Sequence, residues 1–151
     1  MEGLSELPGF GESMKVFLDT NVLIDYLLRR EPFYQDAKKV FELSLYKIDG
    51  FVIPHSLIDV FYMLSERTDA PVEYCQNTIL KLRAVLNVIS EDDAMVFSAA
   101  NNTGFPDFED SMQYESALSA GVDCILTRNP KDFKNSRLAV CSPAEFLQRM
   151  E

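Results

Sequence analysis

Three aspartates, Asp19, Asp59 and Asp110, lie beside short apolar runs of the sequence. If those runs are parallel strands, the three carboxylates meet at one edge of a sheet and repel one another unless a cation neutralises them. A hard divalent ion with oxygen ligands, such as Mg²⁺ or Mn²⁺, suits such a group. An ion held there would generate hydroxide from water and stabilise charge on a phosphodiester oxygen. The residue types therefore indicate metal-assisted hydrolysis of a phosphodiester.

The elements that must position these acids follow from the hydrophobic pattern. Short apolar runs predict buried strands at 15–18, 51–53, 87–89, 124–126 and 138–140. Periodic apolar residues predict helices at 21–30, after Pro32, around 57–64, after Pro71, at 90–102, from 107 to a C-cap at Gly121, and after a capping box at Ser142. Gly50 is interpreted as a break ahead of the second strand. Strands alternating with helices predict an α/β fold whose parallel sheet is covered on both faces.

Helix capping offers a structural explanation for most of these acids. A capping residue followed three positions later by an acid is typical of helix starts, and the pattern occurs at Ser56–Asp59, Ser90–Asp93 and Asp107–Asp110. Acids in a first turn are favoured by the helix dipole alone. Asp19 is different because it ends a buried strand, although it or Thr20 could cap the helix that follows.

Composition restricts the classes of protein to consider. The 151 residues include 14 Lys and Arg against 24 Asp and Glu, a net charge of −10, which disfavours a basic protein that coats nucleic acid. The single histidine, His55, removes His-rich zinc motifs and most Ser-His-Asp schemes. Three scattered cysteines without a CxxC favour buried core residues over a disulfide framework or a thiolate zinc site.

The ends of the sequence and its hydropathy bear on location. Residues 1–13 are polar and aperiodic, and we interpret them as a flexible leader or cloning remnant ahead of a single domain at 14–151. They lack the charged and apolar regions of a signal peptide. No apolar run approaches the roughly 18 residues of a membrane span. We expect a cytoplasmic protein that does not bind membranes.

Three motifs resemble a known family. Met14–Asp25 (MKVFLDTNVLID), Asp107–Gln113 (DFEDSMQ) and Cys124–Phe133 (CILTRNPKDF) are similar to the motifs of PIN-domain ribonucleases, including VapC-type toxins. The resemblance covers about residues 14–147. It implies a three-layer α/β/α sandwich with a central parallel sheet. It also implies an Mg²⁺- or Mn²⁺-dependent endoribonuclease, the toxin of a toxin–antitoxin pair, with RNA as substrate, an antitoxin as partner and a homodimeric state.

The resemblance also implies roles for individual residues. Asp19 and Asp110 match family acids that bind metal, and Asp59 falls where the family has a glutamate one methylene longer. The fourth acidic position falls at Asn129, with Asp132 as the alternative. Small polar residues that hold waters or carboxylates around the ligands would be Asn21, Thr127 and Asp107. RNA that approaches an acidic edge needs cations to offset the repulsion. Those that could line the edge are Arg29, Arg30, Arg128, Lys131, Lys134 and Arg137, and Arg128 and Lys131 are the RNA contacts we expect.

Other functions remain open from the sequence. A PIN-like module that binds RNA or protein through a degraded site is favoured by the shorter Asp59 and by Asn129. A phosphatase of the haloacid dehalogenase type needs a second acid at the position of Asn21, and a response-regulator receiver needs a paired acid and a late lysine that are not seen. Fold alone does not separate these functions.

Overall fold

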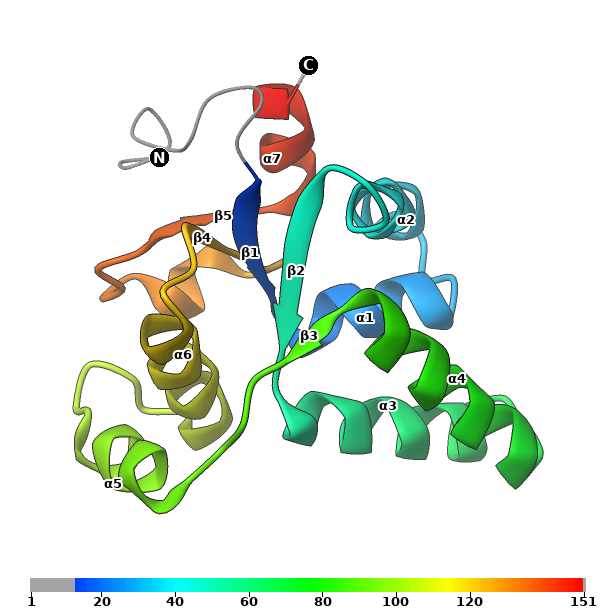
Figure 1. Cartoon of the computed structure of the whole chain (residues 1–151), viewed down its shortest axis with the longest axis horizontal. Helices are drawn as coiled ribbons and strands as arrows, with labels where there is room; N and C mark the ends of the chain where they lie inside the picture. The colour runs from blue at the N-terminus through cyan, green and yellow to red at the C-terminus, as the bar shows by residue number, and fades with distance from the viewer. Residues whose placement is uncertain (1–12, 151) are drawn as a thin grey trace.

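The computed structural model describes residues 13–150, which form a five-stranded parallel sheet in the order β3-β2-β1-β4-β5 (Figure 1). The strands are β1 (Met14–Leu18), β2 (Ile48–Val52), β3 (Asn87–Val88), β4 (Cys124–Leu126) and β5 (Ala139–Cys141). Residues 1–12, most of the expected leader, and residue 151 lie outside the described residues.

Helices connect successive strands, as a parallel sheet requires. They are α1 (Thr20–Leu27), α2 (Tyr34–Leu43), α3 (Pro54–Arg67), α4 (Val72–Val85), α5 (Asp93–Asn101), α6 (Phe108–Ala120) and α7 (Pro143–Met150), with a short 3₁₀ helix η2 (Pro130–Phe133) after β4. Within residues 13–150, none of these helices is both long and apolar enough to cross a membrane.

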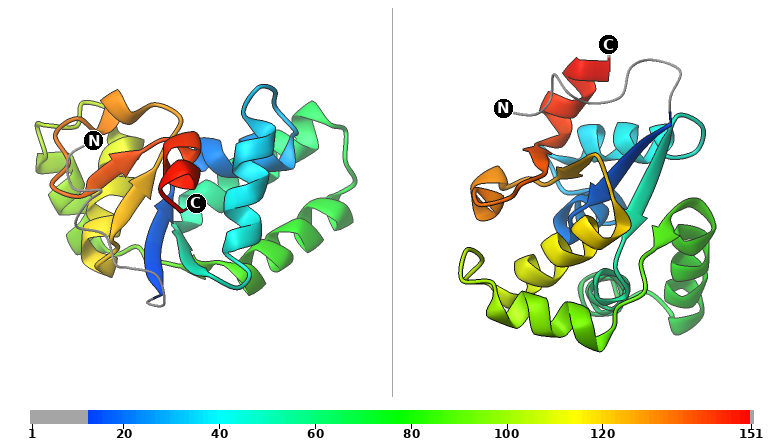
Figure 2. Two further views of the ribbon diagram at one scale, coloured as in Figure 1. Left: turned by 90° about the horizontal axis from the view of Figure 1, so that it is seen from above. Right: turned by 60° about the vertical axis from the view of Figure 1, so that its left-hand side comes forward.

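Each long strand points alternate side chains to opposite faces of the sheet. In β1, Val16 and Leu18 belong to one core with residues of α1, α2, α3, α4 and α7, whereas Phe17 belongs to a second core with residues of α6. Figure 2 shows α5 and α6 on the side of the sheet opposite α1 to α4. This is the α/β/α sandwich predicted from the sequence. The three cysteines are buried and free, as expected.

Gly50 lies inside β2, and its interpretation as a break was wrong. The strand begins at Ile48, three residues earlier than predicted. A Cβ on Gly50 would stand 2.6 Å from Leu86 Cδ2 and 3.1 Å from Ser44 Oγ. Glycine is therefore required by the close approach of neighbouring side chains to the strand, which a local pattern does not reveal.

The ends of α6 and α7 are as predicted. Asp107 Oδ1 accepts a hydrogen bond of 2.9 Å from the backbone N–H of Asp110, and Gly121 ends α6 with a φ of 67°. Ser142 and Glu145 form the reciprocal bonds of a capping box.

Two other helix starts differ from the predictions. Helix α5 begins at Asp93 because Asp92 caps it by accepting from Met95 N–H, so Ser90 is not its cap. Helix α3 begins at Pro54, which leaves Ser56 inside the helix and Asp59 in its second turn. Asp59 is therefore not held in place by helix capping.

Candidate metal centre

Asp19 is the most deeply placed acid at the carboxyl edge of the sheet. Its backbone N–H extends the β1–β4 ladder by donating to Leu126 O at 2.9 Å. Its side chain, 4% exposed, accepts from Thr127 Oγ1 at 2.7 Å and from Gln113 Nε2 at 2.8 Å. It makes no capping bond to α1. A buried carboxylate positioned by neutral donors is arranged for a cation rather than for a helix end.

Burial raises the pKa of Asp19 above its usual range. The hydrogen bonds from Thr127 and Gln113 lower it again, but they do not cancel the effect of burial. The two hydrogen-bond donors thus favour the charged form of the Asp19 carboxylate, which burial keeps away from water.

Gln113 joins α6 to the strand edge, and sequence reasoning missed it. While its Nε2 donates to Asp19, its Oε1 accepts from Thr20 N–H at 3.1 Å. Thr20 Oγ1 in turn lies 2.7 Å from Ser56 Oγ of α3. This buried network holds α1, α3 and α6 together beneath the acids. The available signal was a polar residue three positions after Asp110, on the same face of a helix.

Asp110 is a first-turn acid of α6, as the capping interpretation predicted, yet it also lines a cleft with Asp19. Burial, then the negative charges of Asp107, Asp19 and Asp132, raise its pKa to about 7. An acid that was only a helix-start residue would gain from the dipole and keep its charge. Here burial, together with repulsion among the acids, outweighs that gain.

A second group of side chains lies at the α3 side of the cleft, where Asp59 and Glu109 line it and His55 stands beside them. His55 Nε2 is 3.6 Å from Asp59 Oδ2 and 3.9 Å from Glu109 Oε2. Burial, a hydrogen bond to Asp59 and the charges of Asp59, Asp19 and Asp107 raise the pKa of Glu109 to about 7. Sequence reasoning missed Glu109 and His55, because only the facing of α3 and α6 brings them together.

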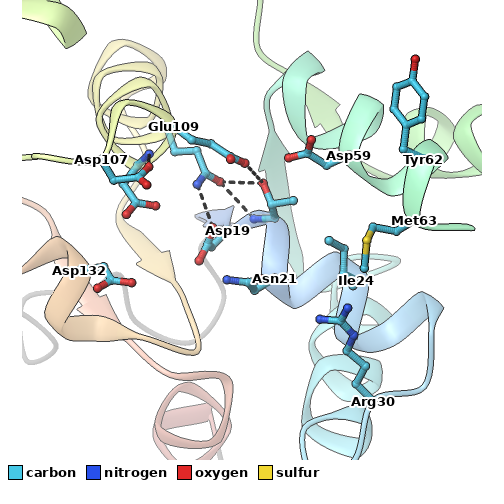
Figure 3. Close-up of a pocket in the computed structure, with 13 residues that line it drawn as sticks. Asp19, Asn21, Ile24, Arg30, Asp59, Tyr62, Met63, Asp107, Glu109 and Asp132 are labelled. Carbon is cyan, nitrogen blue, oxygen red and sulfur yellow. Dashed lines mark hydrogen bonds between the residues drawn. The ribbon is translucent and has the colours of Figure 1, made fainter. Parts of the chain in front are cut away.

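The cleft has a volume of about 500 Å³ and gathers acids from separate parts of the chain. Figure 3 shows Asp19 between Asp107 and Asp132 on one side and Asp59 on the other, with Glu109 above it. Arg30 is the only lysine or arginine among the described residues that line it. A concentration of acids with so little positive charge around it fits a divalent cation with oxygen ligands.

The expected site residues fall into two sets. The residues that line the cleft are Asp19, Asn21, Asp59, Asp107, Asp110 and Asp132. Thr127 lies beneath it and bonds Asp19. The residues that do not line it are Arg128, Asn129 and Lys131.

Asn129 and Arg128 have other contacts. Asn129 donates its backbone N–H to Thr127 Oγ1 at 3.1 Å. Because Asp132 lines the cleft and Asn129 does not, Asp132 is the better placed candidate for the fourth acidic position. Arg128 Nε lies 3.2 Å from Asp25 Oδ2, and its guanidinium stacks 4.5 Å from the Phe33 ring centre.

The residues present fit the ion that the resemblance implies. Carboxylates at the end of β1, on α6 and in η2 line one cleft, and burial and repulsion by neighbouring carboxylates raise the pKa values of Asp19 and Asp110. A bound Mg²⁺ or Mn²⁺ would remove that repulsion. Asp19 and Asp110, the two acids that the resemblance assigns to the metal, both line this cleft.

Comparisons with known proteins agree with this architecture. A family model described as the PIN domain matches residues 15–131. No curated protein sequence matches the chain significantly.

Several solved structures resemble the chain. VapBC-1 from nontypeable Haemophilus influenzae is 21% identical, with a TM-score of 0.64 over 87% of this chain and 99% of that one. A toxin–antitoxin complex from Klebsiella pneumoniae is 21% identical, with a TM-score of 0.66 over 85% and 97%. VapC20 from Mycobacterium tuberculosis, a toxin that cleaves the sarcin–ricin loop, is 15% identical, with a TM-score of 0.58 over 73% and 86%. At these identities the likeness establishes the fold.

Proposed function

The chain belongs to the PIN-domain family, and we propose that it is a metal-dependent endoribonuclease of the toxin type. The observation that carries the proposal is the acidic cleft at the carboxyl edge of the sheet, where Asp19 and Asp110 converge with raised pKa values. Acids held in this state, rather than paired with basic residues, are suited to binding a divalent ion.

In the proposed reaction the chain's own residues hold the metal ion and orient the carboxylates that bind it. Asp19 and Asp110 bind the ion, and Thr127 and Gln113 fix both oxygens of Asp19 so that its charge faces the cleft. A bound Mg²⁺ or Mn²⁺ would supply positive charge to the phosphate and acidify a water for attack on phosphorus. Asp59 stays a predicted ligand, and Asp132 is proposed for the fourth acidic position.

RNA as the substrate is supported by the M. tuberculosis neighbour, a toxin that cleaves the sarcin–ricin loop. Phosphate needs a cation on approach. We assign that contact to Arg30, which lines the cleft, since Arg128 is paired with Asp25. Lys131 is exposed outside the cleft and stays a predicted contact with more distant phosphates.

An antitoxin as protein partner is supported by the complexes named for two neighbours. Helices α3 and α4 expose large apolar side chains, one of which, Tyr62, lines the cleft, and such a surface suits a protein contact. These side chains are Ile58, Tyr62, Val72, Tyr74 and Leu80. The homodimer and the cytoplasmic location expected from the sequence stay predictions.

Cleavage of end-labelled RNA tests the proposed function. We expect wild-type protein to cut RNA with Mn²⁺ or Mg²⁺, EDTA to stop cleavage, and Asp19→Asn to slow it more than about 100-fold, since one ligand's charge supports several kcal/mol of electrostatic stabilisation. Asp93→Asn, an exposed first-turn acid of α5, is the matched control. If several RNAs stay intact with folded wild type and Mn²⁺, the chain is a PIN-like binding module instead.

A further inference from the structure

Three side chains that can bind metal lie together at the α3 side of the cleft, and two of them, His55 and Glu109, have no part in the proposed Asp19–Asp110 centre. The three are His55, Asp59 and Glu109, and one ligand atom from each lies within 4.8 Å of the other two. Their side chains are 47%, 31% and 40% exposed, so water and ions reach them. An exposed acid alone is common, but an imidazole facing two carboxylates is a distinct donor set.

Local structure explains why these three meet. His55 and Asp59 are four residues apart on α3, which puts them on one face of the helix, a spacing that helical metal sites use. The backbone N–H of His55 donates to Glu91 Oε1 at 3.1 Å, which fixes the start of α3. Glu109 reaches the same point from the first turn of α6.

Glu109 is the member of this group that lies next to the Asp19 side of the cleft. One of its oxygens, Oε1, lies 3.4 Å from Thr20 Oγ1, the hydroxyl next to Asp19, while Oε2 faces His55 at 3.9 Å. Figure 3 shows Glu109 between Asp107 and Asp59. The two oxygens therefore face different parts of the cleft.

The spacing of the three donors is close to that of a coordination shell. Ligand atoms around a tetrahedral ion at about 2.1 Å stand roughly 3.4 Å apart. The His55 contacts of 3.6 and 3.9 Å need only small side-chain rotations to reach that spacing. Three ligands leave positions open for water, as in catalytic rather than structural sites.

We propose that His55, Asp59 and Glu109 form a second cation site that binds a borderline transition-metal ion such as Zn²⁺ or Mn²⁺ in preference to Mg²⁺. Imidazole nitrogen is a good ligand for transition metals, whereas Mg²⁺ takes oxygen ligands almost exclusively. The oxygen-only group around Asp19 has no such preference. The part of a second ion in cleavage rests on the proposed nuclease function, but its binding does not.

The single histidine of the chain makes a direct test possible, because the imidazole signals in an ¹H–¹⁵N spectrum belong to His55 alone. We expect ZnCl₂ to shift these signals, and the shift should be complete at one equivalent of Zn²⁺ per chain for this site. Ten equivalents of MgCl₂ should leave them in place. Signals unmoved by Zn²⁺, or moved equally by Mg²⁺, would overturn the proposal.

Variants separate this site from the proposed nuclease centre. Glu109→Gln and Asp59→Asn should each lower the Zn²⁺ affinity measured from the imidazole shift at least about tenfold, since even substituting a residue that only hydrogen-bonds a metal ligand costs that much affinity. Glu115→Gln, also on α6, is the control. Asp19→Asn should keep the shift while abolishing RNA cleavage. An unchanged Zn²⁺ affinity in Glu109→Gln and Asp59→Asn would contradict the assignment, whatever the protein's nuclease activity.

Discussion

Substituting Asp110 by Asn should stabilise the metal-free protein at neutral pH. The pKa of Asp110 is raised from 3.8 to about 7 in the fold, so the folded chain binds the Asp110 proton more tightly than the unfolded chain does. Stability is therefore lost as pH rises from about 4 to about 7, and an asparagine avoids that loss.

The magnitude follows from the size of the shift. Three pKa units correspond to about 4 kcal/mol, which is an upper limit because Asp110 is partly exposed and solvent screens its neighbours. Losing a first-turn charge costs α6 about 0.3–1 kcal/mol. The balance is an increase of about 1–2 kcal/mol in the free energy of unfolding at pH 8, which shrinks toward zero near pH 4.

Urea unfolding at pH 4.5 and pH 8 in EDTA measures this directly. Asp93 is an exposed first-turn acid of α5, so Asp93→Asn should lower the free energy of unfolding by a few tenths of a kcal/mol at pH 8. At a Mn²⁺ concentration 100 times its Kd, wild type should gain about 2.7 kcal/mol and Asp110→Asn much less. An Asp110→Asn variant that is destabilised at pH 8, or stabilised equally at both pH values, would refute a pKa of Asp110 raised by burial and neighbouring charges.

Three further predictions follow from the same contacts. Thr127→Val removes a hydrogen-bond donor to Asp19, so it should raise the pKa of Asp19 further and destabilise the fold by about 1.5–3 kcal/mol. It should also weaken Mn²⁺ binding measured by calorimetry, and an unchanged Mn²⁺ affinity would mean that Thr127 is a packing residue only. The Mn²⁺ affinity of the wild type should rise between pH 6 and 8 and then level off, because protons on Asp110 and Glu109 compete with the ion. An Mn²⁺ affinity that does not change with pH in this range would exclude the two acids as ligands. Gly50→Ala should lower thermal stability by about 1–3 kcal/mol through overpacking, and an unchanged melting temperature would show that its neighbours move aside.

Local patterns were sufficient for the architecture. Apolar runs located the strands to within a few residues, and capping chemistry at Asp107, Gly121 and Ser142 was read correctly because a cap depends only on residues next to it in the chain. Gly50 was misread because its requirement comes from Leu86, which is far away in sequence.

The candidate site was predictable only in part for the same reason. Asp19 stands out because an acid that ends a buried strand is unusual. The roles of Gln113, Glu109 and His55 depend on which faces of α3 and α6 turn toward the sheet edge, and that is set by packing. Asn129 was weighed as the fourth acid from a motif position, whereas η2 brings Asp132 to the cleft.

The most direct test of the acidic cleft as a metal centre is anomalous diffraction from a crystal of the protein grown with Mn²⁺. The account predicts an anomalous peak with oxygens of Asp19 and Asp110 about 2.1–2.3 Å away, and no such peak there in Asp19→Asn. A well-ordered cleft without Mn²⁺ at saturating concentration, or a peak that Asp19→Asn leaves unchanged, would contradict it.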